Sequence, residues 1–279
     1  MDRRTFVGAL GAAGVASLLP SREPLMAAEK LDKIGLQLYT VRGEMKASVE
    51  RTLKAVADIG YKEVEFHDYF GRPPRAIRQL LDRNGLKSPA CHVSLDSLKT
   101  GFHRTLTDAV EIGHKWLIVA YLGTNDRNSV DAIKRTAEAF NKAGRDAKEY
   151  KMRFAYHNHD FEFQEIEGKR IYDILLAECD PKYVDFEMDL YWATKAGASP
   201  LDYFAKHPGR FPLVHVKDRT ATGQMVDVGQ GTIDWGAIFA HRKQAGMKHE
   251  FVEHDEPGDP FASITASYDY LRALRFPNG

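Results

Sequence analysis

Hydrophobic and polar residues alternate in short runs along this chain, and several runs end on side chains that bind metals or carry protons. The segment M-R-F-A-Y-H-N-H-D-F-E-F at residues 152–163 shows the pattern, with an apolar residue at every second position before His157. An alternation with a period of two predicts a β-strand. This strand would deliver His157 at its C-terminal tip.

Three later segments have the same form, at residues 183–189, 211–217 and 248–254. Their tips are Asp189, His215 and Glu253, and the steps from His157 onward are 32, 26 and 38 residues. A strand, a helix and two loops need roughly 30 residues. The spacing therefore predicts four consecutive β/α units, whose tip residues meet at one end of neighbouring parallel strands.

The rest of the chain continues this alternation. Four earlier strands are predicted at residues 33–39, 63–67, 86–92 and 116–120. Eight helices are predicted at 47–59, between Pro73 and Gly85, and at 105–112, 129–150, 171–177, 201–206, 235–244 and 261–274. Eight strands and eight helices in about 250 residues predict the α/β class and a single-domain (β/α)8 TIM barrel.

The first residues do not follow the barrel pattern. Arg3 and Arg4 precede an apolar run at residues 7–19 and then Pro20, which predicts a twin-arginine export signal over residues 1–28 and a barrel domain over 29–279. The run is shorter than the ~20 residues that span a bilayer. The alternative is an N-terminal helix of the mature protein, against which the glycines at 8, 11 and 14 argue. We therefore expect a periplasmic or otherwise exported protein without a membrane span.

Charge and cysteine content narrow the function classes. Lys+Arg and Asp+Glu are both 39, so the formal charge is zero and no basic field would hold a nucleic acid. Cys91 and Cys179 are the two cysteines. They fall in a predicted strand end and a predicted helix end, which favours two free thiols over a disulfide.

The four strand tips offer two imidazoles and two carboxylates, from His157, Asp189, His215 and Glu253. A mixed N/O set suits one divalent ion such as Mn²⁺, Co²⁺, Zn²⁺ or Fe²⁺ better than Ca²⁺, which prefers oxygen alone. A single such residue is most often a helix cap, but four in register favour a shared metal site. His159 has the same parity as His157 and is the alternative ligand from this strand.

Lys217 follows His215 by two residues and would face the same side. A lysine beside a metal suits proton transfer or contact with a substrate oxygen. The alternative is an exposed lysine in a turn.

The opposite half of the barrel mouth also offers polar side chains. Gln37, Glu65 and His92 come from the first three strands, and with His159 they are predicted to bind substrate. A packing role is the alternative for His92.

Residues 220–235 form a glycine-rich segment after the seventh strand. Gly229 and Gly231 predict a loop that folds over the barrel mouth, and Asp234 is predicted to cap the next helix. The alternative is a plain long connection. A phosphate site is poorly supported because no Lys-Ser/Thr pair of a P-loop is present.

Six motifs together resemble the xylose isomerase-like TIM barrels, the sugar phosphate isomerases/epimerases of the AP endonuclease family 2 superfamily. They are G-L-Q-L-Y-T-V-R (35–42), Y-H-N-H-D-F-E-F (156–163), M-D-L-Y-W (188–192), H-V-K-D (215–218), G-Q-G-T-I-D-W (229–235) and V-E-H-D (252–255). Their order and spacing cover essentially everything after the export signal.

This resemblance implies a metal held by Glu, Asp, His and Glu on strands five to eight. Asp189, His215 and Glu253 match the last three positions, whereas His157 stands where the family often has Glu. In the related epimerases the two glutamates also shuttle the proton. The resemblance therefore implies a catalytic Glu253, assisted by Lys217 or His157, and argues against a symmetric two-base mechanism in this chain.

The resulting hypothesis is a metal-dependent isomerase or epimerase that abstracts a proton next to a carbonyl of a sugar or cyclic polyol. A lyase, a dehydratase or a keto-glycoside-cleaving enzyme shares that first step. A non-catalytic carbohydrate-binding barrel is a further alternative, and zero charge and export oppose a nucleic-acid role like that of endonuclease IV. The sequence is compatible with an oligomer and does not identify one.

Overall fold

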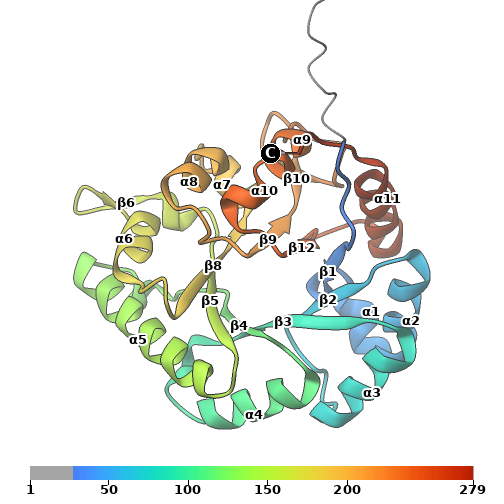
Figure 1. The fold of residues 1–279 in the computed structure, drawn as a ribbon, viewed down its shortest axis with the longest axis horizontal. Helices are drawn as coiled ribbons and strands as arrows, with labels where there is room; N and C mark the ends of the chain where they lie inside the picture. The colour runs from blue at the N-terminus through green and yellow to red at the C-terminus, as the bar shows by residue number, and fades with distance from the viewer. Residues whose placement is uncertain (1–27, 279) are drawn as a thin grey trace, which may run out of the picture.

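A computed structural model describes residues 28–278, in which eight parallel strands close into a barrel (Figure 1). The predicted TIM barrel is therefore confirmed. Neighbours follow the order β1-β12-β9-β8-β5-β4-β3-β2. The barrel strands are β1 (Gly35–Gln37), β2 (Glu63–Phe66), β3 (Lys87–Val93), β4 (Trp116–Val119), β5 (Arg153–His157), β8 (Val184–Asp189), β9 (Leu213–Val216) and β12 (His249–Val252).

Helices surround the barrel, and most begin and end where the sequence predicts (Figure 1). Local capping explains several boundaries. The Ser48 and Ser129 hydroxyls cap their helices by accepting backbone N–H bonds, and Gly85 ends α3 in the left-handed conformation at φ 63°. The helices that follow the predicted pattern are α2 (Val49–Ile59), α3 (Pro74–Asn84), α4 (Phe102–Ile112), α5 (Val130–Glu149), α6 (Ile171–Glu178), α8 (Pro200–Lys206), α9 (Trp235–Ala240) and α11 (Pro260–Ala273).

The predicted number of helices is wrong, because the described residues contain three more. These are α1 (Arg42–Ala47), α7 (Leu190–Lys195) and α10 (Arg242–Ala245). The single helix predicted over 235–244 is interrupted at His241, whose dihedral angles of φ −97° and ψ 12° are not helical. The additional helix α7 lies directly after β8, and α1 follows β1 through a 3-10 turn at Leu38–Val41, so both fall in segments that the sequence pattern predicts as loop.

The loops of the described residues contain short hairpins and 3-10 turns. Two hairpins pair β6 (Glu165–Ile166) with β7 (Lys169–Arg170) and β10 (Asp218–Arg219) with β11 (Met225–Val226). Four 3-10 turns are η1 (Leu38–Val41), η2 (Leu95–Leu98), η3 (Thr124–Asp126) and η4 (Phe161–Phe163).

The barrel interior is layered. An apolar layer consists of Ala90, Trp116, Ile118, Ala155, Leu213 and Phe251. Four of these residues precede a polar residue of the barrel mouth by two positions and so lie one layer deeper on the same inward face. Gly35 makes room for this layer, since a Cβ there would lie 2.5 Å from the Phe251 ring.

A second polar layer lies deeper still, at the N-terminal ends of the strands. The Trp116 indole N–H donates to Asp185 at 2.8 Å, and Asp185 is also paired with Arg153. His249 contacts Glu63 at 2.6 Å. These contacts satisfy the buried charges at this end of the barrel.

The cysteine prediction is confirmed, because Cys91 and Cys179 are both buried and free. Within residues 28–278 no helix has the length and apolar character needed to cross a membrane. The predicted export signal lies outside the described residues.

His114 gives the barrel a predictable dependence of stability on pH. Its Nδ1 donates to the Ser88 carbonyl at 2.8 Å, so the neutral ring accepts from the Tyr69 hydroxyl at 3.0 Å. Burial lowers the His114 pKa from 6.5 to about 4. The protein therefore keeps this stability above pH 6.5 and loses it as the pH falls toward 4.

We expect urea unfolding to show this loss. Between pH 7.5 and 4.5 the His114 contribution to the free energy of unfolding should fall by about 2 to 3 kcal/mol. His114→Gln can keep both hydrogen bonds without titrating, so the wild-type minus variant difference should carry the effect. A difference that does not vary with pH would contradict the assignment.

Candidate active site

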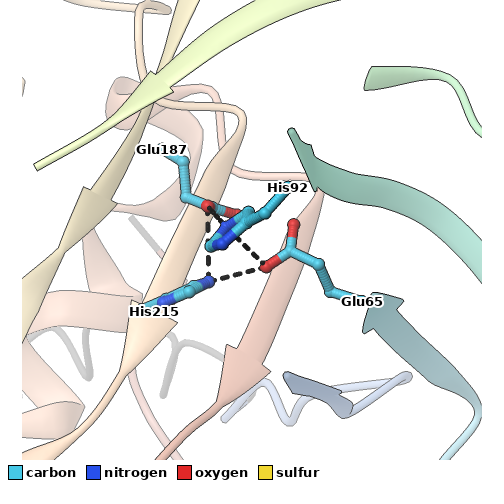
Figure 2. A group of neighbouring side chains, drawn as sticks. All are labelled: Glu65, His92, Glu187 and His215. Carbon is cyan, nitrogen blue, oxygen red and sulfur yellow. Dashed lines mark hydrogen bonds and ion pairs between the residues drawn. The ribbon is translucent and has the colours of Figure 1, made fainter. Parts of the chain in front are cut away.

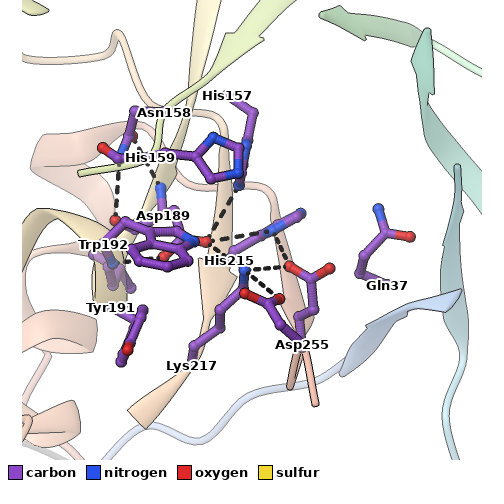
Figure 3. Close-up of polar contacts among 12 residues, drawn as sticks. Gln37, His157, Asn158, His159, Asp189, Tyr191, Trp192, His215, Lys217 and Asp255 are labelled. Carbon is purple, nitrogen blue, oxygen red and sulfur yellow. Dashed lines mark hydrogen bonds and ion pairs between the residues drawn. The ribbon is translucent and has the colours of Figure 1, made fainter. Parts of the chain in front are cut away.

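The four predicted strand tips converge at the C-terminal end of the barrel. Figure 3 shows three of them, His157, Asp189 and His215, close to one another. One ligand atom from each of His157, Asp189, His215 and Glu253 lies within 4.8 Å of the others. All four side chains are buried. We call these residues the upper group.

Asp189 has two roles, one with each carboxylate oxygen. Its Oδ1 accepts from the Trp192 backbone N–H at 2.9 Å and so caps α7. Its Oδ2 lies 3.2 Å from His157 Nε2. The Asn158 side chain fixes the Asp189 backbone by accepting its N–H at 3.1 Å. From the sequence, a residue at a strand tip could be either a helix cap or part of a metal site. The Asp189 carboxylate both caps α7 and belongs to the upper group.

His157, rather than His159, is the β5 residue of the upper group. His159 lines the cavity above it, and burial lowers its pKa to about 4. Glu162 accepts from the Tyr156 hydroxyl and, at 2.8 Å, from the His159 backbone N–H, so its carboxylate is engaged elsewhere.

His215 lies at the centre of the site, with carboxylates on both sides. Its Nδ1 is 2.8 Å from Glu253 Oε2 and 3.7 Å from Asp189 Oδ2. Its Nε2 is 2.7 Å from Glu65 Oε2 and 3.3 Å from Glu187 Oε2. A neutral imidazole carries one N–H, so it cannot donate on both sides.

Lys217 is buried, which excludes the alternative of an exposed turn lysine. Its Nζ lies 2.6 Å from Glu253, 2.9 Å from Asp189 and 2.9 Å from Asp255. Burial alone would lower the Lys217 pKa, but these carboxylates outweigh it and hold the pKa well above its usual range. In turn, burial would raise the Glu253 pKa, but Lys217 and His215 hold it well below its usual range.

Asp255 is a site residue that the sequence analysis did not select. It lies two residues after Glu253, in V-E-H-D, and the same two-residue step that pointed to Lys217 could have found it. Burial raises its pKa to about 6, although Lys217 acts against this.

The upper group fits a divalent ion of the Mn²⁺ to Zn²⁺ series. It supplies two imidazoles and two carboxylates, the donor types these ions accept. His215 Nδ1 and Glu253 Oε2 are buried 2.8 Å apart, yet neither makes a hydrogen bond of acceptable geometry. Glu253 Oε2 is also 2.6 Å from Lys217 Nζ, so the buried Nδ1 of His215 is the atom left without a partner. It faces the Glu253 and Asp189 carboxylates, as a ligand of a shared cation would.

A second cluster lies beside the upper group and shares His215. One ligand atom from each of Glu65, His92, Glu187 and His215 lies within 4.8 Å of the others (Figure 2). We call these residues the lower group. Glu187 was missed by the sequence analysis, although it precedes Asp189 by two residues on the same face of β8.

Charges within the lower group are strongly coupled. Burial raises the Glu187 pKa to about 7. For His92, burial would lower the pKa, but Glu65 and Glu187 raise it to about 9. Gln37 donates to Glu65 Oε2 at 2.7 Å. The two residues predicted to bind substrate from β1 and β2 are therefore engaged with each other.

A cavity of about 420 Å³ opens above both groups. Its lining includes His67, His92, His157, His159, Lys217 and Glu253. Tyr39 and Tyr121 stand at its rim with 38% and 57% of their surface exposed. His92 and His159 thus lie where substrate contact was predicted, whereas Gln37 and Glu65 lie outside the lining.

The segment 220–235 is anchored and is not a plain connection. The Asp218 carboxylate holds this segment in place by accepting hydrogen bonds from the backbone N–H groups of Gly229 at 2.9 Å and Gly231 at 3.2 Å. A Cβ at Gly231 would lie 2.1 Å from Asp218, so only glycine fits. Met225 Sδ contacts the Asp255 backbone N–H at 3.2 Å, which brings the loop to the site. Asp234 caps α9, as predicted.

Comparisons with known proteins agree with this architecture. The sequence model of a family described as xylose isomerase-like TIM barrel matches residues 53–274. A sugar phosphate isomerase/epimerase from Parabacteroides distasonis ATCC 8503 is similar, with 29% sequence identity, 87% of this chain and 98% of that chain covered, and a TM-score of 0.78. A second one from that organism has 25% identity, 92% and 99% coverage, and a TM-score of 0.76.

A more distant similarity concerns the fold alone. The IOLI protein, solved with a bound zinc atom, has 15% identity, 85% of this chain and 95% of that chain covered, and a TM-score of 0.69. A search of curated proteins found no significant match.

Proposed function

This chain belongs to the xylose isomerase-like TIM barrel family, and we propose that it is a divalent-metal-dependent isomerase or epimerase of a sugar or cyclic polyol. The observation that carries the proposal is the convergence of the upper group beneath the cavity. Sites on TIM barrels are built at this end of the strands. The residues would hold one ion through His157, Asp189, His215 and Glu253.

The reaction would begin with removal of a proton next to a carbonyl. A divalent ion held by the upper group would supply Lewis acidity to a substrate carbonyl and its neighbouring hydroxyl, which acidifies the adjacent C–H. Glu253 would take that proton, and its position in the cavity lining supports this role. In isomerisation its carboxylic acid would return the proton to the former carbonyl carbon, while the proton of the neighbouring hydroxyl moves to the former carbonyl oxygen.

Lys217 would tune this base. Its ammonium lies 2.6 Å from Glu253 and 2.9 Å from Asp255, so it weakens Glu253 as a base while it stays in place. A substrate oxygen that accepts a hydrogen bond from Lys217 draws the ammonium away from Glu253. Substrate binding would therefore strengthen the base at the moment it is needed.

His157 favours chemistry on one face of the substrate. A metal-bound neutral imidazole has no free lone pair for a second base. Isomerisation with a single base therefore fits better than a two-base epimerisation. Elimination by a lyase is the second candidate, because Lys217 beside Asp255 could protonate a leaving oxygen.

The cavity favours an unphosphorylated substrate. Among the described lining residues Lys217 is the one Lys or Arg, and it already contacts three carboxylates. A phosphate group would find no free cationic side chain there. The predicted export also accords with an unphosphorylated carbohydrate or cyclitol.

Deuterium exchange tests the proposal. We expect the protein, loaded with Mn²⁺ or Zn²⁺ in D₂O, to incorporate deuterium next to the carbonyl of a keto-sugar that it binds, as followed by NMR. Glu250→Gln changes a buried glutamate on the outer side of β12 and is the matched control for Glu253→Gln. Binding without exchange would leave a carbohydrate-binding barrel, and equal exchange at both epimers would show a second base.

A further inference from the structure

We propose that the lower group is a second divalent-cation site, formed by Glu65, His92, Glu187 and Nε2 of His215. It goes beyond the proposed function, which needs only the upper group. His215 would serve both sites as an imidazolate that has given up its ring proton to solvent, with Nδ1 toward one ion and Nε2 toward the other (Figures 2 and 3).

Nitrogen and oxygen alternate around the lower group. The distances are 2.7 Å from His215 Nε2 to Glu65 Oε2 and 3.2 Å from there to His92 Nε2. They continue with 2.9 Å from His92 Nε2 to Glu187 Oε2 and 3.3 Å back to His215. Four ligands at the usual Zn–N and Zn–O lengths in a tetrahedron are about 3.3 Å apart. The four atoms need to spread by a few tenths of an ångström to hold such an ion.

Two carboxylate oxygens of the lower group have no hydrogen-bond partner. Glu65 Oε1 and Glu187 Oε1 are buried and make no hydrogen bond. Both side chains are fully buried. The large majority of buried polar atoms in proteins form a hydrogen bond, so two oxygens without one in a single cluster point to a cation.

Around His215, negatively charged side chains outnumber positively charged ones. Five buried or mostly buried carboxylates surround His215, from Glu65, Glu187, Asp189, Glu253 and Asp255. Lys217 supplies one positive charge among them. Four negative charges then remain while the histidines are neutral. Two divalent ions supply four positive charges, and with the bridging His215 imidazolate one negative charge remains. One ion in the upper group leaves two negative charges, which would need protons on His92 and Glu187 in a dry interior.

The two sites would differ in access. The lower group has four protein ligands and side-chain exposures of 13% for His92 and 0% for Glu65, Glu187 and His215. A closed set of four protein ligands is typical of structural zinc. An ion there would fix the orientation of the His215 ring for the upper site, as partners of ligating histidines do.

Metal stoichiometry tests the proposal without reference to activity. Purified protein is stripped with a chelator, dialysed against Zn²⁺ and measured by elemental analysis. Asp189→Asn removes a ligand from the upper group alone, Glu187→Gln removes one from the lower group alone, and His215→Ala removes the shared residue. Glu250→Gln is the control, and circular dichroism reports whether each variant is folded.

We expect two ions per wild-type chain and one in each of the Asp189 and Glu187 variants. The lost ion should bind at least roughly 100-fold more weakly, since even loss of a ligand's partner costs 10–100-fold. A wild-type protein with one ion that Glu187→Gln retains would overturn the second site and leave the proposed function intact. Protons on His92 and Glu187 would then balance the lower group.

The opposite result separates the two proposals. One ion that Glu187→Gln removes and Asp189→Asn retains would support the lower site and overturn the upper one, and with it the proposed function. Wild-type protein that retains no ion would overturn both. If His215→Ala is unfolded, the double variant Asp189→Asn with Glu187→Gln, which keeps the His215 ring, should hold no ion.

Discussion

Replacing Glu253 by Gln is expected to lower the exchange and turnover rates by roughly 10²–10⁴-fold, the usual contribution of a general base. The amide is nearly isosteric and can still contact Lys217 through its oxygen, so we expect the variant to bind the sugar. Measured kcat should fall far more than KM rises, because the lost interaction belongs to the chemical step. Turnover of a keto-sugar by the metal-loaded protein is the measurement.

Metal loss must be separated from loss of the base, since Glu253 also belongs to the upper group. Elemental analysis of the Glu253→Gln protein distinguishes the two. If the variant retains its ions and kcat falls, the base is lost. Unchanged kcat in that variant would remove Glu253 from the mechanism and leave His159 and Asp255 among the other bases at the cavity wall.

Replacing Lys217 by Met should destabilise the protein by about 3–5 kcal/mol, the usual result of breaking a buried ion pair by removing one partner. Lys217 is 2% exposed and contacts three carboxylates, which would remain in the interior without their cation. Urea unfolding at neutral pH in the presence of a chelator measures the loss. Added Zn²⁺ should restore part of it, because an ion replaces the missing positive charge.

Lys195→Met is the matched control. Lys195 pairs with Asp160 at 3.7 Å, and 37% of its side chain is exposed. An exposed pair of this kind contributes roughly 0–1 kcal/mol. A Lys217→Met protein as stable as Lys195→Met would show that Lys217 is not the cation that holds these carboxylates together.

The barrel could be predicted from the sequence because each strand is a short apolar run bounded by a tip residue and a helix. The predicted number of helices was wrong where a helix follows its strand directly or through a 3-10 turn. Asp189 ends β8 and caps α7 at once, so the sequence around it fits a strand tip as well as a helix start. Likewise α1 follows β1 through a 3-10 turn that leaves no apolar periodicity to recognise.

The upper group could be predicted because its members occupy equivalent positions at the ends of consecutive strands. The lower group could not, since it joins β2 and β3 to β8 and β9 across the barrel. Residue spacing along the chain carries no information about which strands face each other across the interior. Glu187 is the plainest case, because only the closed barrel brings it to within 2.9 Å of His92.

On β12 the apolar Phe251 separates His249, in the deeper polar layer, from Glu253 at the mouth. On β8 the two sets of charged residues are separated by distance instead. Asp185 and Asp189 are four residues apart on β8, or about 13 Å at the rise of a strand. Perturbations that far apart and without common partners are usually additive within about 0.5 kcal/mol. Changes at Asp185 should therefore be additive with changes at Asp189, whereas Glu187, which lies between them on β8 at the level of Leu213, can couple the mouth to the deeper half of the barrel.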